Sequence, residues 1–384
     1  MNTHERARQK PRIRVGVVGV GNWALRGHIP VLNLLPDYEI VAVHSRRKDA
    51  AAAVAERFGY PHVVDTAGQL VAHPDVDLVV ITTTAPQHED GVRAAIAAGK
   101  DVYSEWPLTT STEKAEALAR LAHDAGVRHV VGLQRRLAPH NRYLRDLLAD
   151  GYVGALRSVR MHVSMNYFQA RLSQALRWTV PPENFSSVIA IYGGHFLDMI
   201  FSAVGWPRTF SALMVNQFNE ITIAETGEVL RTTNPDQLVA TGTIEGGAVF
   251  SVHIEGGKRN NSGVQIDITG DQGDLRITNV SAFGDIGEDY VIEGAHGDDI
   301  PLATLPIPPS YNWLPESGLA SSVLELANVY AAFARDAAEG TRTAPTMDDA
   351  VRMHRLIDLF AESSDNGSRV RVDEAGSQLD RLPD

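Results

Sequence analysis

Ile13-Arg-Val-Gly-Val-Val-Gly-Val-Gly-Asn-Trp-Ala24 is the stretch that decides the fold of this chain. Its valines predict a short buried strand, and Gly19, Gly21 and Ala24 follow in the spacing G-x-G-x-x-A. The amphipathic run that comes next predicts a helix. A strand, a glycine-rich turn and a helix in this order form the fingerprint of a dinucleotide-binding fold, whose turn and helix N-terminus hold the pyrophosphate.

The residues of this fingerprint have separate roles. Gly19 permits the tight turn, Gly21 lets a pyrophosphate approach the backbone, and Ala24 lets the helix pack closely on the strand. Asn22 and Trp23 begin the helix, so we include them in the expected cofactor site. An ordinary turn would show the same spacing, but the strand–helix alternation that follows favours a dinucleotide site.

Two parts of the chain show different hydrophobic periods. Residues 11–133 alternate short apolar strands with alanine-rich helices, which is typical of a parallel, doubly wound sheet. Farther on, residues 249–255 and 264–269 alternate apolar and polar side chains beside glycine turns, which predicts antiparallel hairpins. We therefore expect an α/β Rossmann domain over 11–133 and an α+β domain over 134–384, built on an open, mostly antiparallel sheet.

The second domain also contains expected helices and loops. Apolar periodicity predicts helices near 195–203, over 321–338 and over 347–361. The acidic, glycine-rich stretch 283–299 and the proline-rich stretch 302–315 are expected to be surface loops.

Composition limits the classes of protein. The 384 residues include no cysteine, which excludes disulfides, thiolate metal sites and cysteine nucleophiles. The formal net charge of −12 disfavours nucleic-acid binding. No apolar run is expected to span a membrane, no tight metal-ligand cluster is evident, and residues 1–10 lack the apolar core of a signal peptide. We expect a cytoplasmic protein that binds a small molecule, without metal, nucleic acid or membrane.

The end of the second predicted strand bears on cofactor choice. NAD-binding folds usually place an acidic residue here to accept from the ribose 2′-hydroxyl, and this chain has Ser45, Arg46 and Arg47 instead. These three side chains are suited to a 2′-phosphate, so NADP(H) is the expected cofactor, with NAD as the alternative. The arginines would equally be compatible with a solvated helix start.

A second informative stretch is Ala97-Ala-Gly-Lys-Asp-Val-Tyr-Ser-Glu-Trp-Pro-Leu108. It resembles the end of the fifth strand in the Gfo/Idh/MocA oxidoreductases, where a Glu-Lys-Pro motif follows an Ala-Gly-Lys run. Further matches are His28-Ile-Pro30, Pro86-Gln-His88, Gly132-Leu-Gln-Arg-Arg136 and Gly194-His-Phe-Leu-Asp198. The resemblance implies a Rossmann domain joined to an α+β domain. The open sheet often makes dimers or tetramers in relatives, so we expect a homodimer or homotetramer.

The departures from that family are equally informative. Trp106 replaces the motif lysine, which in catalytic relatives reaches the nicotinamide and a substrate hydroxyl. Ile191 stands where the family usually has an aspartate four residues before its histidine. The chain is therefore most similar to the Gal80-like branch, which contains both oxidoreductases and a non-catalytic sensor that binds dinucleotide.

His195 is the candidate catalytic residue. An imidazole with a pKa near neutrality suits the exchange of a hydroxyl proton during hydride transfer. We expect His195 to open a helix after Gly193-Gly194, where the helix N-terminus would favour the neutral ring. Asp198, three residues on, would either orient His195 or pair with an arginine, and a purely packing role for His195 stays open.

The remaining expected contacts divide by ligand. Substrate contacts are expected from Trp106, Tyr192, Asp198 and Arg136, although core packing or structural ion pairs are alternatives. Besides the residues already named, the resemblance and the strand ends assign cofactor contacts to Thr83, His88, Glu105, Trp106 and Pro107.

These observations support three hypotheses about function. The first is an NADP(H)-dependent oxidoreductase that acts on a sugar, a polyol or a related hydroxy or keto compound. The second is a non-catalytic sensor that binds dinucleotide, a ligand and a partner protein. The third is an NAD-dependent glycoside hydrolase, in which hydride transfer is transient.

Overall fold

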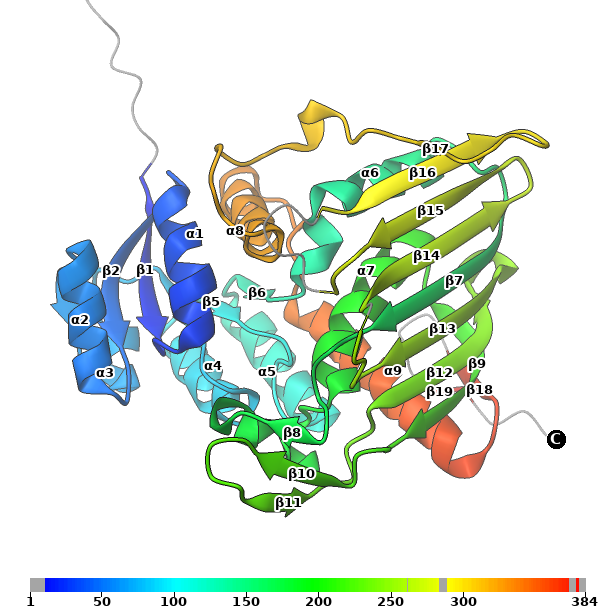
Figure 1. Cartoon of the computed structure of the whole chain (residues 1–384). Helices are drawn as coiled ribbons and strands as arrows, with labels where there is room; N and C mark the ends of the chain where they lie inside the picture. The colour runs from blue at the N-terminus through cyan, green and yellow to red at the C-terminus, as the bar shows by residue number, and fades with distance from the viewer. Residues whose placement is uncertain (1–10, 261, 283–288, 373–377, 380–384) are drawn as a thin grey trace, which may run out of the picture.

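The computed structural model describes residues 11–260, 262–282, 289–372 and 378–379, and its N-terminal part contains a six-stranded parallel sheet (Figure 1). Its strands are β1 (Ile13–Val18), β2 (Tyr38–His44), β3 (His62–Val63), β4 (Leu78–Ile81), β5 (Asp101–Ser104) and β6 (His129–Val131). Their order is β3-β2-β1-β4-β5-β6, which is the Rossmann order, as predicted. The carboxyl ends of β1 and β4 therefore meet at the point where such sheets bind ligands.

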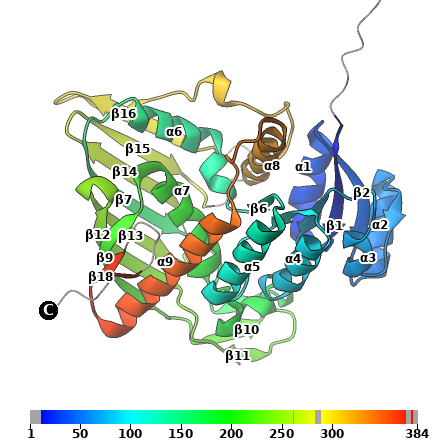
Figure 2. The same ribbon diagram turned by 180° about the vertical axis from the view of Figure 1, so that it is seen from behind.

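Helices cover both faces of this sheet (Figures 1 and 2). The valines of β1 alternate, so that Val18 packs toward one helical layer while Val15 and Val17 pack toward the other. The first layer contains α3 (Ala67–Val71), α4 (His88–Ala97) and α5 (Thr112–Ala125), and the second contains α1 (Ile29–Leu34), α2 (Lys48–Phe58) and α8 (Ser321–Glu339).

Helix α8 comes from the C-terminal part of the chain and yet packs on the N-terminal sheet. Its Leu326 and Tyr330 are fully buried in the same core as Val15 and Val17. The hydroxyl of Tyr38 donates a 2.7 Å hydrogen bond to the carbonyl of Tyr330, which fixes the helix to β2. The unit around this sheet thus contains residues from both sides of position 133.

A ten-stranded sheet forms most of the C-terminal part (Figure 1). Its strands are β7 (Leu156–Ser164), β9 (Pro207–Val215), β12 (Gln237–Ile244), β13 (Val249–Glu255), β14 (Gly263–Gly270), β15 (Gly273–Asn279), β16 (Val291–His296), β17 (Ala303–Thr304), β18 (Val370–Val372) and β19 (Gln378–Leu379). The sheet is antiparallel apart from one central parallel pair, β7 with β13. The predicted hairpins are confirmed as β12–β13 and β14–β15. The order of the strands is β17-β16-β15-β14-β7-β13-β12-β9-β18-β19.

One face of this sheet is covered by α6 (Pro139–Ala149), α7 (Gly194–Val204) and α9 (Met347–Asn366), as Figures 1 and 2 show. Leu213, Val239 and Val249, from three neighbouring strands, are exposed on the molecular surface. A small separate sheet joins β8 (Arg171–Leu172), β10 (Glu220–Ile223) and β11 (Val229–Arg231) around its own apolar cluster. The remaining single turns are η1 (Ala24–His28), η2 (Ala85–Gln87), η3 (Gln134–Leu137), η4 (Gln174–Thr179), η5 (Pro182–Asn184), η6 (Ile189–Gly193), η7 (Glu245–Gly247) and η8 (Pro309–Tyr311).

Part of the predicted loop 283–299 is wrong, because Val291–His296 is strand β16. Its glycine misled the prediction: Gly294 faces the interior, where a Cβ atom would lie 2.7 Å from the hydroxyl of Tyr152. Glycine is needed there for close packing rather than for a turn. Residues 283–288 lie outside the described part of the chain, as do residues 1–10, for which a signal peptide was considered.

The expectation that no apolar run is long enough to span a membrane is also wrong by length and composition. The stretch Pro182–Val204 has a mean hydropathy of 1.5 over its most apolar window. However, 78% of that window is buried inside the protein. This stretch is therefore a core segment, which packs between the large sheet and the domain junction.

Candidate active site

The fingerprint turn leaves space for a ligand. Gly19 has φ +100°, and a Cβ atom there would lie 3.2 Å from the carbonyl oxygen of Thr82, so the turn itself requires glycine. Gly21 differs, because no heavy atom of the described residues beyond its chain neighbours lies within 4 Å of the position a Cβ would take. The buried hydroxyl of Thr83, beside Gly19, has no hydrogen-bond partner in the described structure. These features fit a dinucleotide pyrophosphate.

The helix after the turn starts as the fingerprint predicts, with one irregularity. Asn22 is exposed, and Ala24 is fully buried against the strand. Residues Ala24–His28 form the π-helical turn η1 before α1 begins. Trp23 is half-buried beside His28, with 6.1 Å between the ring centres. Backbone N–H groups at this helix start are available to phosphate oxygens.

The residues proposed to select NADP(H) lie after β2, at the same edge of the sheet. Arg46 and Arg47 are exposed, and Ser45 is half-buried. The hydroxyl of Ser45 accepts a 3.3 Å hydrogen bond from the backbone N–H of Arg47, which holds this turn together. Both arginines are thus on the turn that follows β2, at the carboxyl edge of the sheet.

Glu105 is held in a buried polar setting after β5. Its Oε1 atom accepts a 3.0 Å hydrogen bond from the hydroxyl of Tyr103 and lies 2.9 Å from Nε2 of His28. Burial alone would raise the pKa of Glu105, but His28, His195 and the hydroxyl of Tyr103 together outweigh it and the net pKa is lowered. Glu105 is thus an ionised acceptor, which suits a ribose hydroxyl.

His88, a predicted cofactor contact, is buried between the ends of β4 and β5. Its Nδ1 lies 2.8 Å from the carbonyl oxygen of Pro107, and its Nε2 lies 2.9 Å from that of Thr83. Burial lowers the pKa of His88, so the ring is neutral and has a single N–H, which donates to one of these two carbonyls. The ring thus helps to hold the backbone at the carboxyl ends of the two strands.

Trp106, in place of the family lysine, is locked to a helix. Its indole N–H donates to the carbonyl oxygens of Ala190 (2.8 Å) and Ile191 (3.2 Å), both in the π-helical turn η6. A Cβ atom at Gly194 would lie 2.6 Å from Cε2 of the indole, so only glycine lets the ring approach this closely. Trp106 is 4% exposed. Trp106, expected to contact substrate and cofactor, is therefore a buried wedge packed between Gly194 and the turn η6, and Ile191 contacts it through its backbone carbonyl.

Behind Trp106 lies a residue that sequence reasoning missed. His354 of α9 has no exposed surface, and its ring lies between Trp106 (4.8 Å between ring centres) and Phe185 (4.4 Å). Neither ring nitrogen has a hydrogen-bond partner within the described chain. Burial lowers the pKa of His354 to about 3. Its distance along the chain from Trp106 left no sequence signal.

His195 lies inside a continuous helical run rather than at its start. The π-helical turn η6 leads directly into α7, so the predicted effect of a free helix N-terminus on the ring is wrong. Burial, followed by the positive charge of Arg135, lowers the pKa of His195 to about 3, while Glu105 opposes the shift. Nδ1 is buried without a partner among the described residues, which leaves Nε2 as the nitrogen that a ligand can reach.

Asp198 and Arg136, both proposed to touch substrate, bind each other. The guanidinium of Arg136 makes a bidentate contact with the fully buried carboxylate of Asp198, one hydrogen bond being 2.9 Å long. Arg136 also contacts Asp349 of α9 at 2.8 Å. Burial would lower the pKa of Arg136, but the two carboxylates raise it. Of the two possible roles of Asp198, the structure supports pairing with an arginine.

Tyr192 contributes to an aromatic group near His195. Its ring lies 5.5 Å from that of Phe168 and 6.1 Å from that of Tyr167, which is 43% exposed. Phe168 adopts φ +57°, an unusual conformation for a bulky residue and a frequent mark of functional loops. Tyr192 precedes His195 by three residues of one helical run, and both residues lie near Arg135, whose charge acts on each of them.

A buried arginine lies between this group and α8. Arg135 donates to the hydroxyl of Tyr290 (3.0 Å), to the carbonyl oxygen of Ala282 (2.7 Å) and to Glu325 of α8 (3.4 Å). Its guanidinium also lies 4.3 Å from the ring centre of Phe196. Arg135 is thereby fixed as the positive charge that influences His195.

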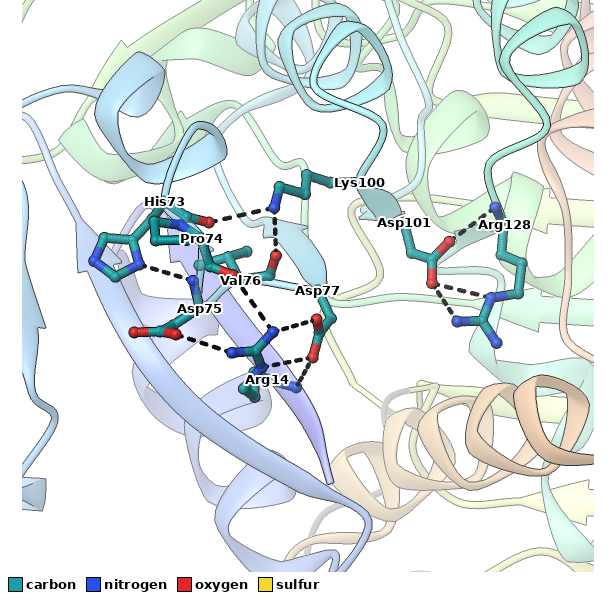
Figure 3. A network of polar contacts seen from close by, with 9 residues as sticks. All are labelled: Arg14, His73, Pro74, Asp75, Val76, Asp77, Lys100, Asp101 and Arg128. Atoms are coloured by element: carbon teal, nitrogen blue, oxygen red, sulfur yellow. Dashed lines mark hydrogen bonds and ion pairs between the residues drawn. The ribbon is translucent and has the colours of Figure 1, made fainter. Parts of the chain in front are cut away.

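A cavity of about 470 Å³ lies at the opposite edge of the Rossmann sheet. Figure 3 shows the charged groups there, which bind one another: Arg14 with Asp77 and Asp75, and Asp101 with Arg128. This is the amino edge of the strands, remote from Gly19 and Gly21. Doubly wound sheets bind nucleotides at the carboxyl edge, so this cavity is not the cofactor site.

Two surface groups combine histidines with an aspartate at distances suited to a cation. In each, one histidine already accepts a backbone N–H at Nδ1, at 3.2 Å for His73 and 3.1 Å for His129. The ring proton then occupies Nε2, which leaves no lone pair for a metal. The two groups are His62, His73 and Asp75, and His123, His129 and Asp348.

Comparison with known proteins agrees with this geometry. Residues 13–133 match the model of the oxidoreductase family with an NAD-binding Rossmann fold, Gfo/Idh/MocA, and residues 139–279 match that of the Gal80p C-terminal domain. The chain therefore contains a Rossmann domain of the Gfo/Idh/MocA oxidoreductase family, followed by a domain of the Gal80p C-terminal type.

Individual relatives include both enzymes and regulators. The dehydrogenase aclE of Aspergillus oryzae is 28% identical over 93% of this chain and 97% of its own. A super-repressor mutant of Gal80p from Saccharomyces cerevisiae has a TM-score of 0.83 at 21% identity, over 95% of this chain and 99% of its own. Levoglucosan dehydrogenase in complex with NADH and L-sorbose has a TM-score of 0.83 at 20% identity, over 95% and 100%. The last two show a common fold.

Proposed function

We propose that this protein is an NADP(H)-dependent oxidoreductase that acts on a carbohydrate-like hydroxy or keto compound, with His195 exchanging the hydroxyl proton. The observation that carries this proposal is the position of His195. Its Nε2 atom is the ring nitrogen that is not enclosed, and its ring lies near Glu105, which follows β5 at the same carboxyl edge of the Rossmann sheet as Gly21. A bound nicotinamide would supply or accept the hydride.

The residues around His195 define its part in the reaction. Because burial lowers its pKa to about 3, the ring is neutral at physiological pH and offers a lone pair to a substrate hydroxyl, but it is a weaker base than the imidazole of near-neutral pKa expected from the sequence. Arg135 adds to the effect of burial by disfavouring a positive charge on the ring. Trp106 and His354 fix the turn that carries this helix, which keeps His195 in place.

Two observations support a ring-bearing, carbohydrate-like substrate. Tyr167, Phe168 and Tyr192 form a group of aromatic rings, and Tyr192 lies three residues before His195 in the same helical run. Aromatic rings pack well against the apolar faces of sugars and cyclic polyols, and the Tyr192 hydroxyl can bind a substrate hydroxyl. The structure of levoglucosan dehydrogenase in complex with NADH and L-sorbose has the same fold.

A non-catalytic sensor of the Gal80 type is the second candidate. The observation that favours it is Trp106, whose indole fills the position of the family lysine and uses its N–H for helix carbonyls. The chain thus lacks the lysine and aspartate pair, and the Gal80p structure shares its fold. The glycoside hydrolase hypothesis has no observation of its own in its favour.

A turnover screen separates these candidates. Purified protein is mixed with NADP⁺ or NAD⁺ and sugars, polyols or hydroxy acids, and with NADPH or NADH and the matching ketones, while nicotinamide absorbance is followed. We expect turnover of a cyclic sugar or polyol with the phosphorylated cofactor. Tight NADPH binding without turnover on any substrate would establish the sensor, and glycoside cleavage without net cofactor change would establish the hydrolase.

We further propose that the protein is a cytoplasmic homodimer or homotetramer that binds neither nucleic acid nor membrane. The support for self-association is the face of the large sheet that α6, α7 and α9 leave uncovered, together with the exposed Leu213, Val239 and Val249. Light scattering at micromolar concentration tests this, and a monomer would contradict it.

A further inference from the structure

A buried chain of polar groups connects α8 to the cofactor edge of the Rossmann sheet. The hydroxyl of Tyr330 lies 2.7 Å from Nδ1 of His28, and Nε2 of His28 lies 2.9 Å from Oε1 of Glu105. Tyr330 and His28 have no exposed surface, while the side chain of Glu105 is 12% exposed. The chain therefore runs from a helix far along the sequence to a carboxylate that reaches the site.

The chemistry of the three groups sets the direction of their hydrogens. A carboxylate can only accept, so the ring proton that faces Glu105 must lie on Nε2 of His28. Nδ1 then carries a lone pair and accepts from the hydroxyl of Tyr330. The contact of Nε2 with Oε1 is close but not well aligned, so its main contribution is electrostatic. Tyr330 thus fixes which nitrogen of His28 carries the proton toward Glu105.

Ring packing keeps this chain rigid. Tyr330 stacks on Tyr103, with 4.8 Å between ring centres and 13° between planes. The ring of His28 meets both of them edge-on, at 5.2 Å from Tyr103 and 5.9 Å from Tyr330. Tyr103 also donates its hydroxyl hydrogen to Oε1 of Glu105. The packing of Tyr330, Tyr103 and His28 on one another therefore positions both groups that contact Oε1 of Glu105, which are the Tyr103 hydroxyl and Nε2 of His28.

We propose that Tyr330 and His28 are positioning residues for the dinucleotide site, which hold the Glu105 carboxylate in the orientation that binds a ribose hydroxyl. Helix α8 accordingly supports the cofactor site, although it comes about 200 residues after the Rossmann segment in the sequence. This inference rests on the proposed function only in assuming that a dinucleotide binds at Gly19 and Gly21. It requires no turnover.

Removal of one hydroxyl tests this proposal. Tyr330→Phe keeps the stack on Tyr103 and deletes only the donor to His28. Titration of the full chain with NADPH and with NADH, followed by fluorescence, should show a dissociation constant raised about three- to tenfold, the range of one ordinary hydrogen bond. Tyr38→Phe is the matched control, because it removes a buried tyrosine hydroxyl that binds the same helix at the carbonyl of Tyr330. The control should bind within about twofold of wild type.

A double-mutant cycle shows whether the hydroxyl acts through Glu105. Glu105→Gln should weaken binding more than Tyr330→Phe does, and in that background Tyr330→Phe should have no further effect beyond about twofold. Equal effects of Tyr330→Phe in both backgrounds, wild-type affinity in Tyr330→Phe, or equal losses in Tyr330→Phe and Tyr38→Phe would each overturn the inference. Unchanged binding in Gly21→Val would instead show that the proposed cofactor site is wrong.

Discussion

The two halves of the domain junction follow different rules. The cofactor half keeps the pattern of its family in the backbone: Gly19 has the positive φ of the turn, and the position of Gly21 is open. The catalytic half has replaced the family's side chains, with Trp106 wedged on Gly194 and Ile191 offering only a carbonyl. The comparison teaches that cofactor binding depends on backbone shape, which few substitutions satisfy, whereas the catalytic half can be repacked around one remaining histidine.

The largest expected effect concerns the catalytic half. His195→Ala should lower kcat by about 10²–10⁴, the usual contribution of general acid–base catalysis, with NADPH affinity nearly unchanged. Steady-state kinetics and fluorescence titration measure the two quantities. His296→Ala, which removes an exposed histidine on β16, serves as the control. Turnover of His195→Ala at the wild-type rate would show that His195 does not exchange the proton, and the contrast drawn here between the two halves would be wrong.

The next effect concerns the cofactor half. Gly21→Val places methyl groups where the pyrophosphate must lie, and we expect NADPH affinity to fall by at least about a hundredfold. The protein should still fold, because the position is open in the unliganded structure. Circular dichroism and thermal unfolding check the fold. Gly68→Val in α3 is the control, since it also meets little crowding but is not part of the fingerprint.

Cofactor choice gives a smaller change. Arg46→Asp removes a charge expected at the 2′-phosphate, and the ratio of NADPH to NADH affinity should fall about ten- to a hundredfold. Competitive titrations with both cofactors measure the ratio. Arg57→Asp, near the other end of α2, should leave it unchanged. An unchanged ratio in Arg46→Asp would favour NAD.

The buried indole of Trp106 should contribute measurably to the free energy of unfolding. Trp106→Phe keeps an aromatic ring but removes the donor to the carbonyls of Ala190 and Ile191, so we expect a loss of about 1–3 kcal/mol in the free energy of unfolding. Chemical denaturation measures this loss. Trp206→Phe, outside the junction, controls for the loss of an indole. No difference between these two variants would show that the wedge is not held by its N–H.

The free energy of unfolding should also decrease gradually as the pH is lowered, because three buried histidines resist protonation in the folded protein. His140, His195 and His354 each have a pKa lowered to about 3 by burial, against about 6.5 in the unfolded chain. The unfolded state therefore binds more protons between about pH 6.5 and 3, so stability is complete above pH 6.5 and is lost as the pH falls. Each histidine contributes a slope of up to about 1.4 kcal/mol per pH unit. Chemical denaturation at several pH values from 8 to 5 measures this slope. In His354→Phe the slope should correspond to about one fewer proton taken up on unfolding.

The sequence predicts these two halves unequally. Glycine spacing and strand–helix alternation were sufficient for the sheet order and the turn at Gly19, because these depend on local backbone preference. The pairing of Arg136 with Asp198, the position of His88 between two loop carbonyls and the tilted contact of His354 with Trp106 depend on contacts between distant elements. No local pattern encodes such contacts. Arg136 and Asp198, which were expected to contact substrate, are therefore found to form an ion pair with each other.

Helix α8 has a consequence for the order of events during synthesis. The helical layer on the face of β1 that contains Val15 and Val17 lacks α8, one of its three helices, until the chain has been made to residue 339. A fragment that ends at residue 133 would leave the apolar surface that α8 covers in water and should aggregate, even though it contains the whole sheet and helices α1 and α2. The Rossmann half of this protein is thus the first to emerge from the ribosome and among the last to be completed, and its contacts are of high contact order.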